Sequence, residues 1–204
     1  MTPFTRHTGR AVPLDRANVD TDQIIPKEFC VRVERSGFGR FLFAHWRREP
    51  GFVLDLPQHR GASILVAGDN FGCGSSREHA VWTIQDAGFR AVIAPSFGDI
   101  FRNNCHKTGV LPVVLPAAEA LMRTVAGVPA TEVTVDLERQ VVEVPDGRWH
   151  FEIDAFVKDC LLNGWDDIGL TLRDERAIAD YEARVPTALG APVEARESGQ
   201  GDPR

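Results

Sequence analysis

The chain has 204 residues, 43% of them hydrophobic and 25% charged, which is the composition of an ordinary globular protein of one domain with or without an appendage. Its formal net charge of −6 disfavours nucleic acid or an anionic membrane surface as the main partner. The opening residues include no apolar signal segment, and no run approaches the roughly 18 apolar residues of a membrane span, so we expect a cytoplasmic protein.

The first third of the chain contains one clear strand followed by irregular segments. Residues 10–14 predict a strand that ends in the polar turn RANVDTD. The segment FLFAHWRRE at 41–49 is apolar and then charged, so it predicts a short helix or an aromatic-rich loop under the core. Residues 51–62 are expected to form a connection.

The middle of the chain alternates strand and helix patterns. The apolar run SILVAGD at 63–69 predicts a buried strand, and a glycine-rich loop follows it. The next segment carries apolar residues at helical spacing, and Gly88 is expected to end that helix. A strand at 91–94, a helix at 97–107 and a strand at 110–115 complete the pattern. This order predicts an α/β layer with parallel strands.

Beyond residue 116 the pattern changes. Residues 131–144 alternate apolar and polar side chains, as half-buried antiparallel strands do. Three helices are expected in this part, at 117–127, 154–162 and 174–184. The end of the chain is small, polar and rich in Pro and Gly. We therefore predict one domain over residues 1–185 and a disordered tail over 186–204.

Residues 72–79 read GCGSSREH, and several interpretations compete for this loop. A dinucleotide-binding loop needs glycine where Arg77 stands, and a GxSxG nucleophile elbow needs glycine where Glu78 stands. Ser75 and His79 are close enough in sequence to interact, but adjacency alone does not make a catalytic triad. Ser75 and Glu78 also match a helix capping box, which is the simplest interpretation of the local pattern.

A further interpretation adds chemistry to this helix start. A helix N-terminus presents unbonded N–H groups and the positive end of the helix dipole. A hydroxyl held there beside Arg77 would have its deprotonated form favoured. The same groups suit a substrate carboxylate, which an arginine binds through two parallel hydrogen bonds. The loop is therefore equipped to bind a di- or tricarboxylate and to hold a serine near an acidic C–H group.

Four blocks of the sequence resemble one family, in the family's order. GDNFGCGSSREHA at 68–80 resembles the signature of the aconitase swivelling domain, and NVDTDQIIP at 18–26 is similar to the segment that opens this domain in isopropylmalate isomerases. PSFGDIFRNNCHKTGVLPV at 95–113 and DDIGLTL at 166–172 extend the resemblance to residues 4–185. The chain is thereby identified as a member of the 3-isopropylmalate dehydratase small-subunit family. The resemblance implies an α/β fold, a swivelling β/β/α domain of the aconitase type with a parallel strand–helix layer and additional antiparallel strands.

The resemblance also implies an activity. Members of the family interconvert 2-isopropylmalate and 3-isopropylmalate through a dehydrated intermediate, in leucine biosynthesis, and act only with a separate large subunit. That partner holds a [4Fe-4S] cluster, one iron of which acts as a Lewis acid on the substrate. This chain is then expected to bind a small hydroxy-dicarboxylate and to hold no metal or cofactor itself. Its four cysteines are far apart, form no Cys-x-x-Cys pair and are expected to stay reduced (Cys30, Cys73, Cys105 and Cys160).

Site residues are carried over by their position in these blocks. Ser75 matches the base that removes the proton next to a carboxylate. Arg77 matches the arginine that holds the substrate and steadies the serine oxyanion, and Ser76 is a candidate for a carboxylate contact. Asp22 matches an active-site acid that orients the surrounding groups, although an Asx turn or a helix cap explains this residue equally well.

Residues 30–39 stand where the family carries its substrate-selecting loop. Arg35 is near the place where an aconitase reads an extra carboxylate with an arginine, while a solvated loop charge is the simpler interpretation. Val31, Val33 and Phe38 are candidates to line an apolar pocket for an isopropyl group. One methyl group changes binding by only about 1–3 kcal/mol, so a related hydro-lyase of the homoaconitase or methylmalate type stays an alternative. A stand-alone carboxylate-binding module on the same fold is the other alternative.

Overall fold

The computed structural model describes residues 1–31, 36–128 and 130–184. It divides the chain into one compact unit, Met1–Asp167, and a second unit that begins at Ile168. Within the described ranges, no helix combines the length and the apolar character that crossing a membrane requires. The predicted tail at 186–204 lies outside the described residues.

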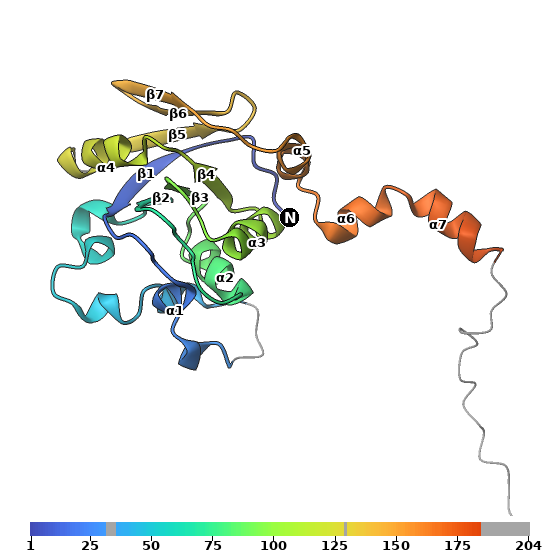
Figure 1. The fold of residues 1–204 in the computed structure, drawn as a ribbon, viewed down its shortest axis with the longest axis horizontal. Coiled ribbons are helices and arrows are strands. Elements are labelled where there is room, and N and C mark those ends of the chain that lie inside the picture. Colours follow the sequence, from blue (N-terminus) through green and yellow to red (C-terminus); the bar gives the residue numbers. More distant parts are fainter. Residues whose placement is uncertain (32–35, 129, 185–204) are drawn as a thin grey trace, which may run out of the picture. The chain divides into compact units, whose positions relative to one another are not determined.

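A sheet that has seven strands in the described residues forms the centre of the first unit (Figure 1). Its strands are β1 (Arg6–Leu14), β2 (Ile64–Ala67), β3 (Ala91–Ala94), β4 (Leu111–Val114), β5 (Glu132–Asp136), β6 (Val141–Val144) and β7 (Gly147–His150). They lie in the order β4-β3-β2-β1-β5-β6-β7. The neighbours from β4 to β1 are parallel, and those from β1 to β7 are antiparallel. This confirms the predicted parallel layer with additional antiparallel strands.

Strand β1 joins the two halves of the sheet because it pairs along its whole length. Its first part, from Arg6 to Arg10, pairs antiparallel with β5, and its second part, from Ala11 to Leu14, pairs parallel with β2. The second part is fully buried, while the first alternates between exposed and half-buried residues. The predicted strand at 10–14 therefore covers little more than the buried part, since the first part has no continuous apolar run.

The helices in the described residues are α1 (Thr21–Ile24), α2 (Glu78–Asp86), α3 (Asp99–Thr108), α4 (Ala118–Gly127), α5 (Ala155–Asn163), α6 (Asp167–Leu172) and α7 (Glu175–Glu182). Helices α2 and α3 cover one face of the sheet and α4 covers the other (Figure 1). Strand β2 shows how both faces are filled, because Leu65 and Ala67 pack with α2 and α3, while Ile64 and Val66 pack with α4. Burial on both faces explains why the parallel strands read as unbroken apolar runs.

The segment between α1 and β2 consists largely of single 3₁₀ turns, at Lys27–Phe29, Gly39–Phe41, Trp46–Arg48, Val53–Asp55 and Pro57–His59. Its aromatic rings pack under the first face of the sheet. Phe43 stacks on Trp46 with 5.2 Å between ring centroids and meets Phe52 edge-on at 6.0 Å. The structure thus forms the aromatic-rich loop that was one of the two predictions for residues 41–49.

Candidate active site

The candidate site residues lie in loops that leave one edge of the sheet. Because β1, β2 and β3 are parallel, their carboxyl ends meet at the same edge, where α/β proteins commonly bind ligands. The loop after β1 enters α1, and the loop after β2 carries the GCGSSREH run into α2. One isolated bridge, Asp20 with Cys73, joins these two loops, and a second, Phe71 with Phe97, joins the loop after β2 to the loop after β3.

Helix α1 is a single turn that its own side chains cap. The Asp20 carboxylate accepts the Gln23 N–H at 2.8 Å, and the Gln23 side chain accepts the Asp20 N–H at 2.8 Å, which is a capping box. The capping box predicted for Ser75 and Glu78 is wrong. Helix α2 begins at Glu78, its N-cap is Arg77 in extended conformation, and no side chain caps it. The first N–H groups of α2 are therefore left for another acceptor.

The loop before α2 exposes both of its serines. Ser75 and Ser76 are exposed, so the predicted base is accessible from solvent. Gly72 shapes the loop: its φ is +73°, and an added Cβ would lie 2.2 Å from the ring of Phe101 in α3. Only glycine tolerates that conformation at that distance from a buried ring. The loop path that presents the serines therefore depends on this residue.

Arg77 reaches from the start of α2 to Asp22 in α1. Its Nη2 donates to Asp22 Oδ2 at 2.6 Å, and its Nη1 lies 2.5 Å from Oδ1 as an ion-pair contact. The hydrogen bond from Arg77 lowers the pKa of the Asp22 carboxyl, and the same bond raises the pKa of the Arg77 guanidinium. Both groups therefore stay charged at neutral pH. The capping position belongs to Asp20, so the Asp22 carboxylate is available to orient the arginine.

Two cysteines lie near the same loops. Burial raises the pKa of the Cys30 thiol and of the Cys73 thiol above the usual value, so both are neutral thiols at neutral pH. In the part of the chain that the structure describes, no three His, Cys, Asp or Glu side chains are placed to hold a metal ion.

The predicted substrate-selecting loop is described only at its two ends. Arg35 and Val33 lie outside the described residues, so their roles stay predictions. Val31 is 84% exposed, and its predicted place in an apolar pocket stays a prediction.

The prediction that Phe38, at the other end of this loop, lines an apolar pocket for an isopropyl group is wrong. It is fully buried, with its ring edge-on to His79 at 5.3 Å and tilted against Trp82 at 6.2 Å. Its N–H donates to the Asp86 carboxylate at 2.9 Å. A phenylalanine gains more from burial in this aromatic cluster than from lining an exposed loop, so it anchors the end of the loop on α2.

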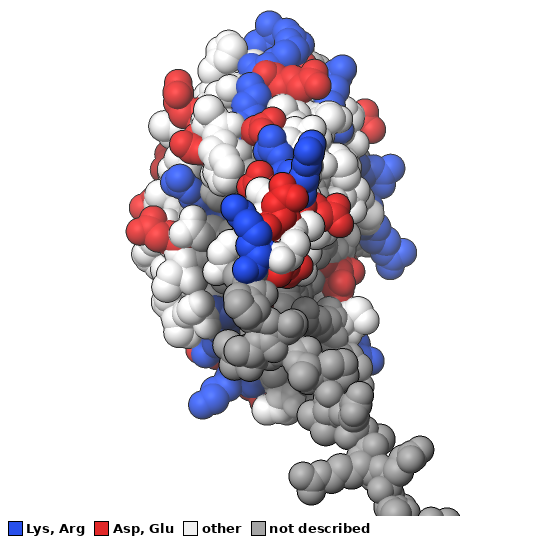
Figure 2. Space-filling model, turned by 90° about the vertical axis from the view of Figure 1, so that its right-hand side faces the viewer, with Lys and Arg blue, Asp and Glu red and all other residues white. Residues whose placement is uncertain are grey.

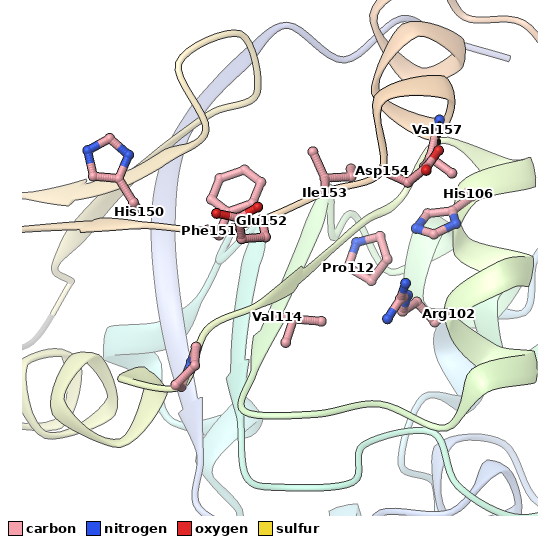
Figure 3. Close-up of a pocket in the computed structure, with 11 residues that line it drawn as sticks. Arg102, His106, Pro112, Val114, His150, Phe151, Glu152, Ile153, Asp154 and Val157 are labelled. Atoms are coloured by element: carbon pink, nitrogen blue, oxygen red, sulfur yellow. Dashed lines mark hydrogen bonds between the residues drawn. The ribbon is translucent and has the colours of Figure 1, made fainter.

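A cavity of about 620 Å³ lies away from these loops, along the outer strand β4 (Figure 3). Arg102 and His106 of α3 face Pro112 and Val114 of β4 across it, and the segment after β7 forms the remaining wall. None of the predicted site residues that the structure describes, Asp22, Ser75, Ser76 and Arg77, lines this cavity. We place the candidate site at the GCGSSREH loop because the two exposed serines directly precede Arg77, which pairs with Asp22.

Charges of both signs are interspersed over the face of the molecule that Figure 2 shows. Among the described residues on that face, Lys and Arg form no continuous stripe of the kind that nucleic-acid-binding proteins use.

Three family models match successive parts of the chain. The Aconitase C-terminal domain matches residues 1–118, and a model described as LeuD_N matches residues 119–155. The C-terminal domain of the 3-isopropylmalate dehydratase small subunit matches residues 167–188.

Curated relatives match over nearly the whole chain. Proteins named 3-isopropylmalate dehydratase small subunit from Rubrobacter xylanophilus, Acidothermus cellulolyticus and Parafrankia sp. are 56%, 60% and 57% identical to it over 188 residues. These matches cover 91% of this chain and 95% to 96% of each relative. The crystal structure of 3-isopropylmalate dehydratase (LeuD) from Methanocaldococcus jannaschii is similar in fold, with a TM-score of 0.66 at 27% identity. That match covers 87% of this chain and 99% of the other.

Proposed function

The chain belongs to the 3-isopropylmalate dehydratase small-subunit family, and on that premise we propose that it interconverts 2-isopropylmalate and 3-isopropylmalate together with a large subunit. The reaction is that of a hydro-lyase, which removes water and adds it back with hydroxyl and hydrogen exchanged between neighbouring carbons. One observation carries the proposal at the level of residues. The exposed Ser75 lies two residues before Arg77, the N-cap of the uncapped helix α2, and the Asp22 carboxylate holds that arginine in place.

Ser75 is the proposed base. The unbonded N–H groups at the start of α2 and the charge of Arg77 both favour its deprotonated form. Its oxygen would take the proton from the carbon next to a substrate carboxylate. The electrons of that C–H bond would form the double bond as hydroxide leaves the neighbouring carbon. In the reverse addition the same hydroxyl returns a proton, so one residue serves both half-reactions.

Arg77 and Ser76 are proposed to contact the substrate, and Asp22 is proposed to orient Arg77. A guanidinium has five N–H donors, so Arg77 can keep its contacts to Asp22 and still donate to a substrate carboxylate. Ser76 lies next to the base and is exposed, as a carboxylate contact requires. Asp22 acts through Arg77, whose direction it fixes. Arg35 is proposed to take part in substrate selection, by its position in the loop at 30–39.

The large subunit is proposed to carry the iron–sulfur cluster, which when bound would supply a Lewis acid for the leaving hydroxyl. The described residues of this chain do not fit such a cluster, because no three metal-ligating side chains among them converge. On this proposal, this chain contributes the base and part of the carboxylate site.

Reconstitution tests the proposal. The chain is co-expressed with the large subunit of its own organism, purified without oxygen, and assayed with 2-isopropylmalate, homoaconitate and 2-methylmalate. We expect the complex to be active, each subunit alone to be inactive, and kcat/KM to be highest with 2-isopropylmalate. A higher kcat/KM with one of the other acids would assign the chain to a related hydro-lyase.

Calorimetry separates this proposal from a stand-alone carboxylate-binding module. An enzyme site shared between two proteins leaves the isolated chain with only part of its contacts, so we expect no binding of 2-isopropylmalate in the micromolar range. Tight binding by the isolated chain, together with an inactive complex, would favour the binding module.

A further inference from the structure

The segment after β1 and the loop after β2 are joined by a short ladder of hydrogen bonds. The Gly72 N–H donates to the Val19 carbonyl at 2.7 Å, and the Thr21 N–H donates to the Cys73 carbonyl at 3.1 Å. The Thr21 hydroxyl then donates to the Ser75 carbonyl at 3.0 Å. A side chain therefore makes the last bond of the ladder, at the residue proposed as the base.

The two bonds from Thr21 lie on either side of Gly74. This glycine has a φ of +88°, and a Cβ added to it would lie 4.0 Å from the Thr21 hydroxyl oxygen. Glycine allows the backbone many conformations, so the position of Ser75 would otherwise vary with rotations at Gly74. Thr21 is only 2% exposed, and its buried hydroxyl has a fixed partner. The hydrogen bond to the Ser75 carbonyl therefore restrains the loop directly after Gly74, its most flexible residue.

The same bond sets the direction of the next peptide group. In a trans peptide the C=O and the N–H point in opposite directions, so holding the Ser75 carbonyl against α1 directs the Ser76 N–H away from α1. It also fixes the backbone from which the Ser75 side chain leaves. The neighbour of Thr21 in α1 is Asp22, which holds Arg77. Two consecutive residues of one capped turn thus restrain Ser75 and Arg77.

We propose that Thr21 is a positioning residue for Ser75, an inference that rests on the proposed function of Ser75 as the base. Thr21 does not touch the reacting atoms in this arrangement. It acts by holding the serine backbone where the hydroxyl reaches the substrate C–H. No local sequence pattern identifies this role of Thr21. In the sequence, a buried threonine that positions a neighbouring residue cannot be distinguished from one that only packs in the core.

Two substitutions distinguish the effect of the Thr21 hydroxyl on kcat from the effect of its packing. The kinetics of both variants are measured in the complex with the large subunit. Thr21→Val keeps the shape and removes the donor, so we expect kcat to fall about 10- to 100-fold, with KM changed by less than about threefold. Thr21→Ser keeps the donor and loses a buried methyl group, so we expect kcat within about threefold of the unmodified chain, despite a lower unfolding midpoint. A kcat that follows the unfolding midpoint and not the hydroxyl would overturn the proposal.

Thr131 provides a matched control. It is 7% exposed and its hydroxyl also donates to a backbone carbonyl, that of Val128 at 2.5 Å, in the turn before β5. Thr131→Val removes a comparable buried bond outside the site loops, so we expect kcat unchanged. If Thr21→Val does not assemble with the large subunit, Thr21→Ala removes the same hydroxyl with a smaller side chain and is compared with Thr21→Ser in its place.

A double-mutant cycle tests whether Thr21 acts through Ser75. If it does, adding Thr21→Val to Ser75→Ala leaves the residual rate within about twofold of Ser75→Ala alone. A further loss as large as that of the single Thr21 variant would show an independent role and overturn the inference. The cycle also separates the two proposed roles. Full activity of Ser75→Ala rejects the proposed base and the inference with it, whereas an inactive Ser75→Ala with a fully active Thr21→Val rejects the role of Thr21 alone.

Discussion

Asp22 holds both terminal nitrogens of Arg77 across 55 positions of sequence, and in doing so it joins α1 to the start of α2. The Arg77 side chain is 18% exposed and that of Asp22 is 53% exposed, so the pair lies at the surface with the arginine on its inner side. Ser75 and Ser76 directly precede Arg77. The Asp22 carboxylate therefore sets the orientation of the Arg77 guanidinium in the candidate site.

Arg77→Lys tests whether the site needs the planar guanidinium group of Arg77. Lysine carries one ammonium group and cannot reproduce two parallel hydrogen bonds to a carboxylate, so we expect KM to rise and kcat to fall, with kcat/KM lowered at least about 10-fold. Steady-state kinetics of the reconstituted complex measures both constants, and circular dichroism checks the fold. If neither constant moves, the role of Arg77 is structural.

Asp22→Asn tests the orienting carboxylate with almost no change of shape. The amide retains one acceptor but loses the charge, so Arg77 is held less firmly and KM is expected to rise about 3- to 10-fold. The pair is surface-exposed, so the free energy of unfolding should change by less than about 1 kcal/mol. Asp20→Asn is the matched control two residues earlier, because asparagine caps a helix as well as aspartate does. An equal rise of KM in both variants would mean that damage to α1, and not the loss of the pair, causes the effect.

Ser75→Ala removes the proposed base. We expect kcat of the complex to fall at least about 100-fold, the scale of a lost acid–base group, while the unfolding midpoint stays the same because Ser75 is exposed. Ser76→Ala, on the adjacent exposed serine, should change KM more than kcat. Turnover near that of the unmodified complex would remove Ser75 from the mechanism.

Gly72→Ala and Gly88→Ala compare two left-handed glycines in different surroundings. Their φ values are +73° and +94°, so each substitution costs about 1–2 kcal/mol of backbone strain. A Cβ at Gly88 meets no atom within 4 Å, whereas one at Gly72 would lie 2.2 Å from the Phe101 ring and adds about 1–3 kcal/mol of overpacking. Urea unfolding of the two variants should therefore show a clearly greater loss for Gly72→Ala. Equal losses would mean that the Phe101 ring moves aside without cost.

His106 predicts a pH dependence of stability. Burial, with a smaller effect of Arg102, lowers its pKa from 6.5 to about 4 in the folded chain. Between these values the unfolded chain binds more protons than the folded one, so the free energy of unfolding falls as the pH drops through this window. From pH 7.5 to pH 5 the expected loss is on the order of 1–2 kcal/mol.

Urea unfolding at the two pH values checks this. His106→Gln should remove that part of the loss, while His150→Gln, at an exposed histidine, should leave it in place. The same pH dependence in His106→Gln and the unmodified chain would contradict the assignment.

Much of the parallel layer could be predicted from local patterns. The strands predicted at 63–69, 91–94 and 110–115 contain the observed β2, β3 and β4, because burial on both faces demands unbroken apolar runs. Helix α6 was not predicted, since its six residues are too few to show a helical period. The first part of β1 was missed for a related reason, as its half-exposed residues follow no apolar run.

The candidate site shows where such patterns stop being informative. Ser75-x-x-Glu78 and Asp20-x-x-Gln23 are both possible capping boxes in the sequence, and only the second forms. The structure holds the Ser75 carbonyl against Thr21 and leaves Arg77 extended, so Ser75 stands two residues before the helix cap. Phe38 was expected to line an apolar pocket for an isopropyl group and is buried instead, because it packs against the aromatic rings of His79 and Trp82 in α2.

The sequence by itself determined the order of the parallel strands and the helices between them, the α/β class and the family, since each of these depends on residues close together along the chain. It also marked Ser75, Arg77 and Asp22 as residues of interest. Only the tertiary structure decided that Asp22 meets Arg77 and that Thr21 holds the Ser75 backbone. Contacts between residues more than 50 positions apart depend on how β1 and β2 pair, and no local pattern encodes the position at which two such loops meet.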